Sequence, residues 1–189
     1  MPAYKEVIEE LKSKTIKPLY GEFYDFEGFP LEEEFQKLYT FSQDFIQRED
    51  LDFNIKPARV YFNTDTRVNA VAYNSQDYYL MEIFKGAIFY FYDYFTCRED
   101  VFCQAQFEKY YNLMDKKEIS GSYVLFQFAI LFIFYHETGH LIQRNTDEPA
   151  YVEFVTGHIP RNSIKERHIR EHDADWFSAG QIAFHTLQF

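Results

Sequence analysis

Cysteine is scarce in this chain, and its two cysteines, Cys97 and Cys103, lie six residues apart. That spacing matches neither a C-x-x-C redox pair nor a paired-cysteine zinc knuckle, which excludes both of those classes of site. We expect both thiols to be reduced, with one or both buried as small apolar groups. Proline (6) and glycine (7) are also few, and no linker or internal repeat divides the 189 residues. The sequence therefore predicts one domain, residues 1–189, that is long enough to bury its own core.

Positive charge is the second deficit. The chain has 19 Lys and Arg against 30 Asp and Glu, a net charge of −11. Nucleic acids and anionic membrane surfaces are recognised by basic patches, so the composition excludes both as partners. The acidity also helps to keep a chain with 21% aromatic residues soluble. The first residues, "MPAYKEVIEELKSK", are charged and lack the apolar stretch of a signal peptide, which predicts a cytoplasmic protein.

No uninterrupted apolar run reaches the length that a bilayer requires. The longest, "YVLFQFAILFIFY" at 123–135, has thirteen residues and contains Gln127. About 20 apolar residues are needed to cross the hydrocarbon core, so we expect no membrane span. A short segment that is apolar on all sides is instead typical of a buried central helix.

Periodicity along the chain predicts helices, then three strands, then more helices. Val-, Tyr- and Phe-rich stretches separated by turn formers read as strands: "ARVYFNT", "VNAVAYN" and "DYYLMEI". Amphipathic or apolar patterns predict helices at 3–13, 31–49, 83–95, 99–116 and 122–144, and from Ser163 to the end. The order predicts an α+β domain in which a small sheet of about three strands packs on a buried helix, with further helices at both ends.

The apolar helix continues into "FYHETGHLIQ", residues 134–143. His136 and His140 are four residues apart, so both imidazoles project from one helix face. Two nitrogen ligands on one face are half of a tetrahedral zinc shell, and Glu137 is placed to reach a water on that metal. The motif is short enough to arise by chance, so its surroundings must supply the remaining ligand.

A catalytic zinc needs a third protein ligand. The metzincin pattern would place Gly at 143 and His at 146, where this chain has Gln143 and Thr146, so that branch is excluded. On the last helix Glu171 and Asp175 share a stripe with apolar residues, and a carboxylate on such a face needs a partner. Zinc would be that partner for Glu171, and Asp175 would accept the free N–H of a ligating histidine.

Two other interpretations of the last helix remain open. Its carboxylates would pair with Arg167 or Arg170 if they lay on an exposed face. His168 and His172 are rival ligands, also four residues apart, although His172 falls on a different stripe from Glu171.

The two motifs together resemble the gluzincin metallopeptidases, in which H-E-x-x-H is followed by a glutamate helix. "EHDADWFSA" is similar to their E-x-x-A-D-x-x-A pattern. The strand-rich stretch "ARVYFNTDTRVNAVAYNSQDYYLMEIFKGAIFYF" resembles the segment before the motif in small gluzincin domains, which include CAAX-type membrane proteases and their soluble relatives. "GHI" at 157–159 is similar to Lit-type phage-exclusion peptidases. The resemblance covers 57–185 and implies a zincin-like core at 57–189 behind a helical N-terminal extension at 1–56.

The resemblance implies a zinc-dependent peptidase acting on a peptide or protein substrate. It implies Zn²⁺ held by His136, His140 and Glu171, Glu137 as general base, and Asp175 behind a ligand. The substrate would bind along an edge strand made of Val68, Asn69, Ala70, Val71, Ala72 and Tyr73. A His or Tyr is expected to stabilise the oxyanion, and the candidates are Tyr151, His158, His168 and His172. Two alternatives stay open: a zinc-binding domain that acts through a protein partner without hydrolysis, and an aromatic helical domain without metal.

Overall fold

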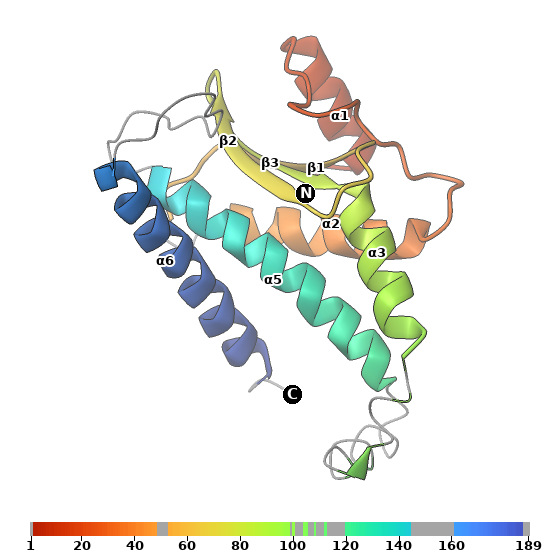
Figure 1. The fold of residues 1–189 in the computed structure, drawn as a ribbon. Helices are drawn as coiled ribbons and strands as arrows, with labels where there is room; N and C mark the ends of the chain where they lie inside the picture. The colour runs from red at the N-terminus through yellow and green to blue at the C-terminus, as the bar shows by residue number, and fades with distance from the viewer. Residues whose placement is uncertain are drawn as a thin grey trace.

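The computed structural model describes residues 2–48, 53–98, 120–144 and 161–186, with 100, 104, 105, 108 and 112 as isolated positions. Five helices and three strands are seen in this part of the chain (Figure 1). They are α1 (Tyr4–Ser13), α2 (Glu32–Gln47), β1 (Ala58–Asn63), β2 (Ala70–Ser75), β3 (Tyr78–Phe84), α3 (Lys85–Thr96), α5 (Gly121–Arg144) and α6 (Arg161–Thr186). The predicted α+β class and the helices at both ends are confirmed. The helix expected at 99–116 lies almost wholly outside the described residues.

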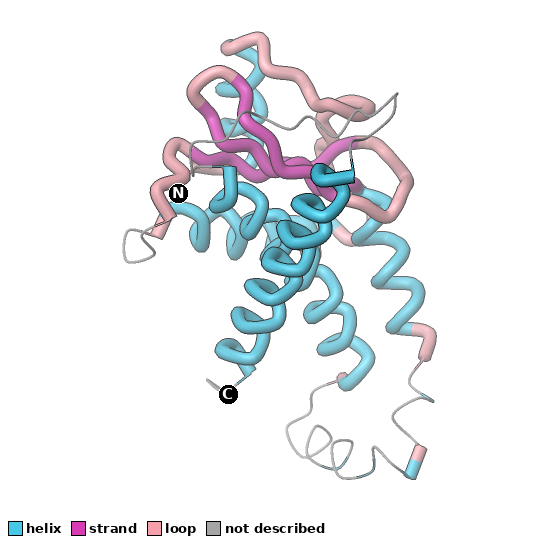
Figure 2. The backbone as a smooth tube through the Cα atoms, turned by 60° about the vertical axis from the view of Figure 1, so that its left-hand side comes forward, coloured by secondary structure: helices cyan, strands magenta, loops and turns pink. Residues whose placement is uncertain are grey.

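The three strands form one mixed sheet (Figure 2), and their order is β1-β3-β2 (Figure 1). β1 runs parallel to β3, and β2 runs antiparallel to it with Ala72 opposite Met81. This order puts β3 in the centre although it is last in the chain. β2 begins at Ala70, so Val68 and Asn69 of the expected edge strand precede the assigned strand.

The outer edge of β1 is closed by the N-terminal part of the chain. The buried side chain of Gln43 from α2 donates to the carbonyl of Ala58 and accepts from the N–H of Val60. The hydroxyl of Tyr4 accepts from the N–H of Phe62, and the N–H of Thr64 donates to a carbonyl at Glu22. Within the described part of the chain, β2 has a strand partner on one side only, so its outer side is the sheet edge left without a strand.

Aromatic side chains fill the core on both sides of the sheet, as the composition predicts. α1 lies on one side of the sheet, and α2 and α5 lie on the other (Figure 1). Phe35 of α2 meets Phe62 of β1 edge to face at 5.0 Å between ring centroids, a geometry that adds to the area buried. Residues of α1, α2, the sheet and α5 share one buried cluster. Cys97 carries a free, exposed thiol and does not contribute to this core.

One carboxylate is fully buried away from the histidines. Glu82 of β3 accepts hydrogen bonds from the N–H groups of Leu19 and Tyr20, from the hydroxyl of Tyr61 and from the amide of Asn63. Backbone and neutral side-chain donors therefore satisfy this charge, and they fasten the segment after α1 to the sheet.

Helix α5 passes beneath the sheet and contacts β2, β3, α3 and α6. Burial is concentrated in its second half, where Phe134, Tyr135 and Leu141 are inaccessible to solvent. In its first half Gln127 is exposed and Phe132 is 37% exposed, so the expectation of burial on every side is wrong there. By length and composition alone, residues 121–143 are sufficient to cross a membrane, and 39% of the apolar window is buried.

Candidate metal centre

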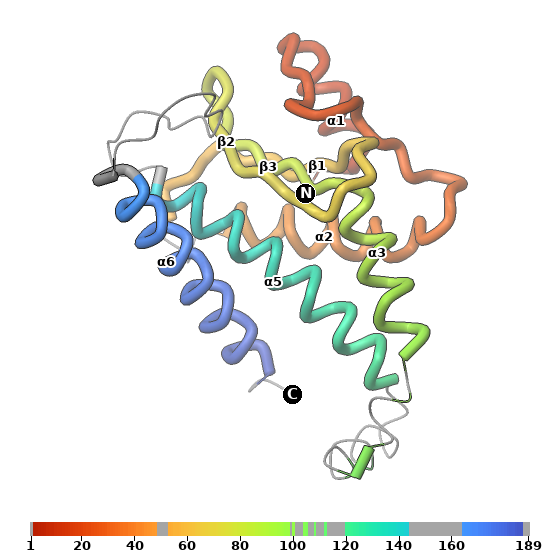
Figure 3. The backbone as a smooth tube through the Cα atoms, viewed as in Figure 1, coloured from red at the N-terminus to blue at the C-terminus, as the bar shows by residue number. Residues whose placement is uncertain are grey.

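Helices α5 and α6 lie side by side and carry all three predicted metal ligands (Figures 1 and 3). The two helix backbones come close together at Gly139 of α5 and the fully buried Ala174 of α6. A Cβ atom on Gly139 would lie 3.1 Å from the Ala174 Cα atom and 3.3 Å from its Cβ atom. Two small residues therefore let the backbones meet where larger side chains would hold them apart. His136 and Glu171 each lie three residues before this contact, so the contact sets their separation.

Replacing Ala174 with leucine is expected to weaken zinc binding about tenfold or more. The added carbons have no space opposite Gly139, and overpacking of this kind costs about 1–3 kcal/mol while it moves Glu171 away from the histidines. Zinc affinity, measured by competition with a chromogenic chelator, tests this. Ala179 is an exposed alanine of the same helix, so Ala179→Leu is the matched control. Unchanged affinity in Ala174→Leu would show that the close contact does not set the ligand geometry.

Three potential ligand atoms converge between the two helices. The Nε2 atoms of His136 and His140 are 3.0 Å apart, and Oε2 of Glu171 lies 3.3 Å from the first and 3.5 Å from the second. A tetrahedral zinc ion bound at about 2.0–2.1 Å requires ligand atoms separated by about 3.3 Å. The observed triangle has that size, so the residues fit a metal ion with three protein ligands.

The outer nitrogens of both imidazoles have acceptor partners, which decides where their protons lie. Nδ1 of His136 is 2.9 Å from a carboxylate oxygen of Asp175, and Nδ1 of His140 is 3.0 Å from the amide oxygen of Gln143. Each Nδ1 must carry the hydrogen in its bond, because an oxygen of this kind can only accept. Each Nε2 then presents a lone pair to the shared centre. Two lone pairs and a carboxylate oxygen facing one another at 3.0–3.5 Å form a set of acceptors suited to a metal cation.

Glu137 is almost completely buried, at 9% exposure, and is close to both imidazoles and to the backbone of Ala72 on β2. Burial raises the pKa of its carboxyl group, and the neighbouring His140 and His136 and the backbone N–H of Ala72 oppose that rise. A carboxyl group in these surroundings, beside the three-ligand group but not part of it, has the position expected of a proton acceptor.

The alternation of backbone hydrogen bonds along β2 shows which of its N–H and C=O groups face the open edge of the sheet. The carbonyl of Asn69 accepts a hydrogen bond from the N–H of Phe84, which lies opposite it. Along an antiparallel pair of strands, opposite residues alternate between hydrogen-bonded and non-hydrogen-bonded pairs. With the observed register, Val71 and Tyr73 bond to β3, whereas Ala70, Ala72 and Asn74 direct their N–H and C=O groups outward. The interaction between the Ala72 N–H and Glu137 agrees with this alternation. The open edge and the carboxyl group of Glu137 therefore lie together.

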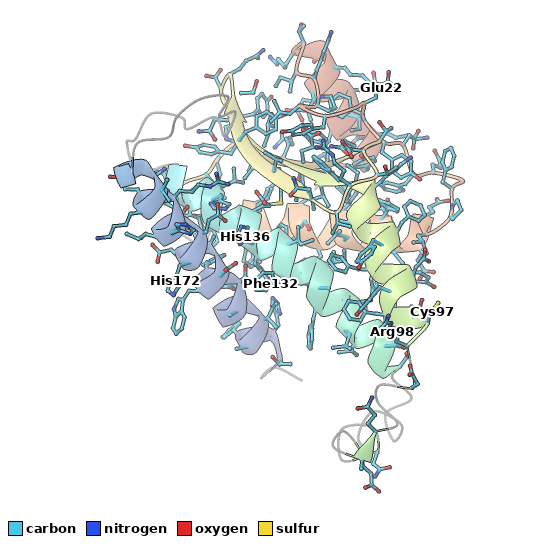
Figure 4. All side chains as sticks on the ribbon, in the orientation of Figure 1. Glu22, Cys97, Arg98, Phe132, His136 and His172 are labelled. Atoms are coloured by element: carbon cyan, nitrogen blue, oxygen red, sulfur yellow. The ribbon has the colours of Figure 1, made fainter. Side chains whose placement is uncertain are left out.

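The remaining predicted residues are not in this group. Figure 4 marks His136 on α5 and His172 on α6. The His172 side chain is 77% exposed and lies 3.6 Å from Asp173, and His168 is also exposed. Neither belongs to the three-residue cluster found among the described residues. Tyr151 and His158, the other oxyanion candidates, lie outside the described residues.

The two carboxylates of α6 face the histidines of α5, whereas the alternative interpretation paired them with Arg167 or Arg170 on an exposed face. Glu171 faces both histidines and Asp175 bonds to one of them. Phe132, one turn before His136, packs its ring near that imidazole at 6.3 Å between centroids and leaves an apolar surface beside the site (Figure 4).

The chain matches no family model, no curated protein and no solved structure. The resemblance to gluzincins therefore rests on the two motifs and on the geometry that unites them. That geometry shows a possible metal-binding group of two histidines and one glutamate, next to a three-strand mixed sheet.

Proposed function

We propose that this chain is a zinc-dependent metalloendopeptidase of the gluzincin type. The observation that carries the proposal is the convergence of three acceptor atoms from His136, His140 and Glu171 at tetrahedral spacing. Two imidazoles and one carboxylate are a ligand set found in catalytic zinc sites, which keep a further position open. Asp175 and Gln143 hold the imidazoles from behind, as outer partners do in such sites.

In hydrolysis a metal ion and one side chain would have separate roles, the first as Lewis acid and the second as general base. Zinc bound here would supply a Lewis acid that polarises a carbonyl group and lowers the pKa of a water molecule. Glu137 would accept a proton from the attacking water and pass it to the leaving amine. Its burial disfavours the charged form and makes proton uptake easier, while the backbone N–H of Ala72 favours the charged form.

The substrate in this proposal is an extended peptide that pairs with the open edge of β2. Main-chain groups of an edge strand form a ready template for an added strand, and such binding recognises backbone more than side chains. Ala70 and Asn74 offer N–H and C=O groups on either side of Ala72, whose N–H is engaged by Glu137. We therefore expect cleavage in unfolded or flexible segments and not at one residue type.

Asn74→Pro is expected to lower the kcat/KM for an unfolded protein about 2–10-fold and to leave zinc content unchanged. Proline removes the outward N–H, and one hydrogen bond is worth about 0.5–1.5 kcal/mol. Proline is tolerated on the outer side of an edge strand, so the fold should survive. Asn74→Thr keeps the donor and is the control. Equal loss in both variants would remove the edge of β2 from the substrate model. Val71→Pro is a poor test because the Val71 N–H bonds to β3.

We also propose that the chain works in the cytoplasm without a membrane span. Support comes from α5 itself, which carries the candidate ligands and packs against the sheet and two other helices, although its length and composition would allow a span. An acidic chain is a poor fit to an anionic membrane or a nucleic acid, which favours a peptide or protein partner.

The decisive measurement is proteolysis of a labelled unfolded protein by the zinc-loaded chain, by the same chain after chelation, and by Glu137→Gln. Zinc-dependent cleavage that requires Glu137 supports a peptidase. Zinc binding without cleavage would instead support a zinc-binding domain that acts through a protein partner, and failure to bind zinc would leave an aromatic helical domain.

A further inference from the structure

Gln143 lies at the end of α5, three residues after His140, where it bridges the two helices of the metal centre. Its amide oxygen is 3.0 Å from Nδ1 of His140. Its amide nitrogen donates to the backbone carbonyl of Arg170 on α6 at 2.8 Å. Arg170 immediately precedes Glu171. One amide group thus contacts a histidine ligand on one side and the backbone next to the carboxylate ligand on the other.

The chemistry of the Arg170 carbonyl fixes the orientation of this amide. A carbonyl oxygen can only accept, so the NH₂ group of Gln143 must face it and the amide oxygen must face His140. That oxygen can only accept as well, so Nδ1 of His140 must be protonated. The Nε2 lone pair then points to His136 and Glu171, as a metal ligand requires.

We propose that Gln143 is a positioning residue for the metal centre, setting the tautomer of His140 and the position of Glu171 through a single amide. The inference rests on the proposed function, because it assumes that these residues hold a metal. Gln143 does for His140 what Asp175 does for His136, and it also fastens α6 to α5 one residue before the carboxylate ligand.

Zinc affinity of a Gln143→Met variant tests this. Methionine keeps the length of the side chain and loses both hydrogen bonds, so affinity should fall about 10–100-fold. Gln143→Glu keeps an acceptor for the His140 N–H but loses the donor to the Arg170 carbonyl, so it should recover part of the lost affinity and bind zinc more tightly than Gln143→Met. Gln127 is an exposed glutamine on the same helix, so Gln127→Met is the matched control and should bind zinc normally.

Two further readouts separate positioning from general stability. The visible absorption of the Co²⁺-loaded Met variant should differ from that of the wild type, because the imidazole is no longer fixed. The melting temperature of the metal-free Met variant should fall by only a few degrees, the loss expected from two hydrogen bonds of about 1 kcal/mol each. Wild-type affinity in Gln143→Met, or no recovery in Gln143→Glu, would overturn the inference while the proposed function stands. A wild type that binds no zinc would overturn both.

Discussion

His136→Ala should bind no zinc at concentrations that saturate the wild type. The substitution removes one of three ligand atoms, and it also removes the imidazole that joins Asp175 and Glu171 across the helix pair. A metal that binds only the folded chain stabilises it by mass action, by about 2.7 kcal/mol when zinc is at 100 times its Kd. For a chain of this size that corresponds to about 5–10 °C in melting temperature. Zinc should therefore raise the melting temperature of the wild type and leave that of His136→Ala unchanged.

Metal content by mass spectrometry, on protein purified without a histidine tag, gives the direct measurement. The comparison within each variant of zinc-loaded and chelated protein removes the effect of lost side-chain contacts on stability. His172→Ala is the control, because this histidine is on α6 beside Glu171 but its side chain is 77% exposed. Retention of one zinc per chain in His136→Ala, or loss of zinc in His172→Ala, would show that the ligand set is different.

The candidate metal-ligand group was predictable because helical periodicity alone brings its pairs onto shared faces. A spacing of four residues puts His136 beside His140 and Glu171 beside Asp175 whatever the tertiary structure. The apolar neighbours of Glu171 indicated that its face would be covered; Ala174 and Ser178 on that face are fully buried, whereas Ile164 is 41% exposed and the Asp175 side chain is 57% exposed. The three-strand sheet was predictable from local sequence as well, because Val, Tyr and Phe favour strands and the turn formers between the runs mark where each strand ends.

The contacts between elements were not predictable in the same way. Gly139 and Ala174 determine how closely the two ligand helices approach, but a small residue in one sequence does not reveal its partner. In the sequence, Gln143 stands out only as a departure from the metzincin pattern. Its spacing of three from His140 was a signal that it lies on the same helix face. The hydrogen bond from Gln143 to the carbonyl of Arg170 on the other helix depends on tertiary packing, which the sequence pattern does not indicate.

The family resemblance implied that residues 68–73 form an edge strand, and β2 is at the edge of the sheet, whereas the periodicity of the sequence does not give the order of the strands. Sequence order would place β2 in the centre, whereas β3 is the central strand and β2 is at the edge. The side chains of residues 68–73 would alternate between the two faces of the sheet whether this strand were central or at the edge, so their pattern does not distinguish the two arrangements. Which backbone groups face outward depends on the pairing of Asn69 with Phe84, a hydrogen bond that cannot be assigned without the register.

Glu137→Gln should keep its zinc and lose peptide hydrolysis by a factor of about 10² or more, the loss expected when acid–base catalysis is removed. Glu137 is not among the three ligand atoms, so the metal content should match that of the wild type. The glutamine amide oxygen can still accept from the Ala72 N–H, and a neutral group avoids the cost of a buried charge. The variant should therefore fold with at least the stability of the wild type. A loss of activity would then come from the loss of proton transfer and not from unfolding.

Cleavage of a labelled unfolded protein, with zinc content measured on the same sample, provides the test. Glu166→Gln makes the same substitution at an exposed position of α6 and should cleave at the wild-type rate. Cleavage by the zinc-loaded Glu137→Gln at that rate would assign the activity to another group or to a contaminant. Because Glu137 lies beside both the histidine pair and the open edge of β2, a bound peptide and the metal centre would act together through this side chain.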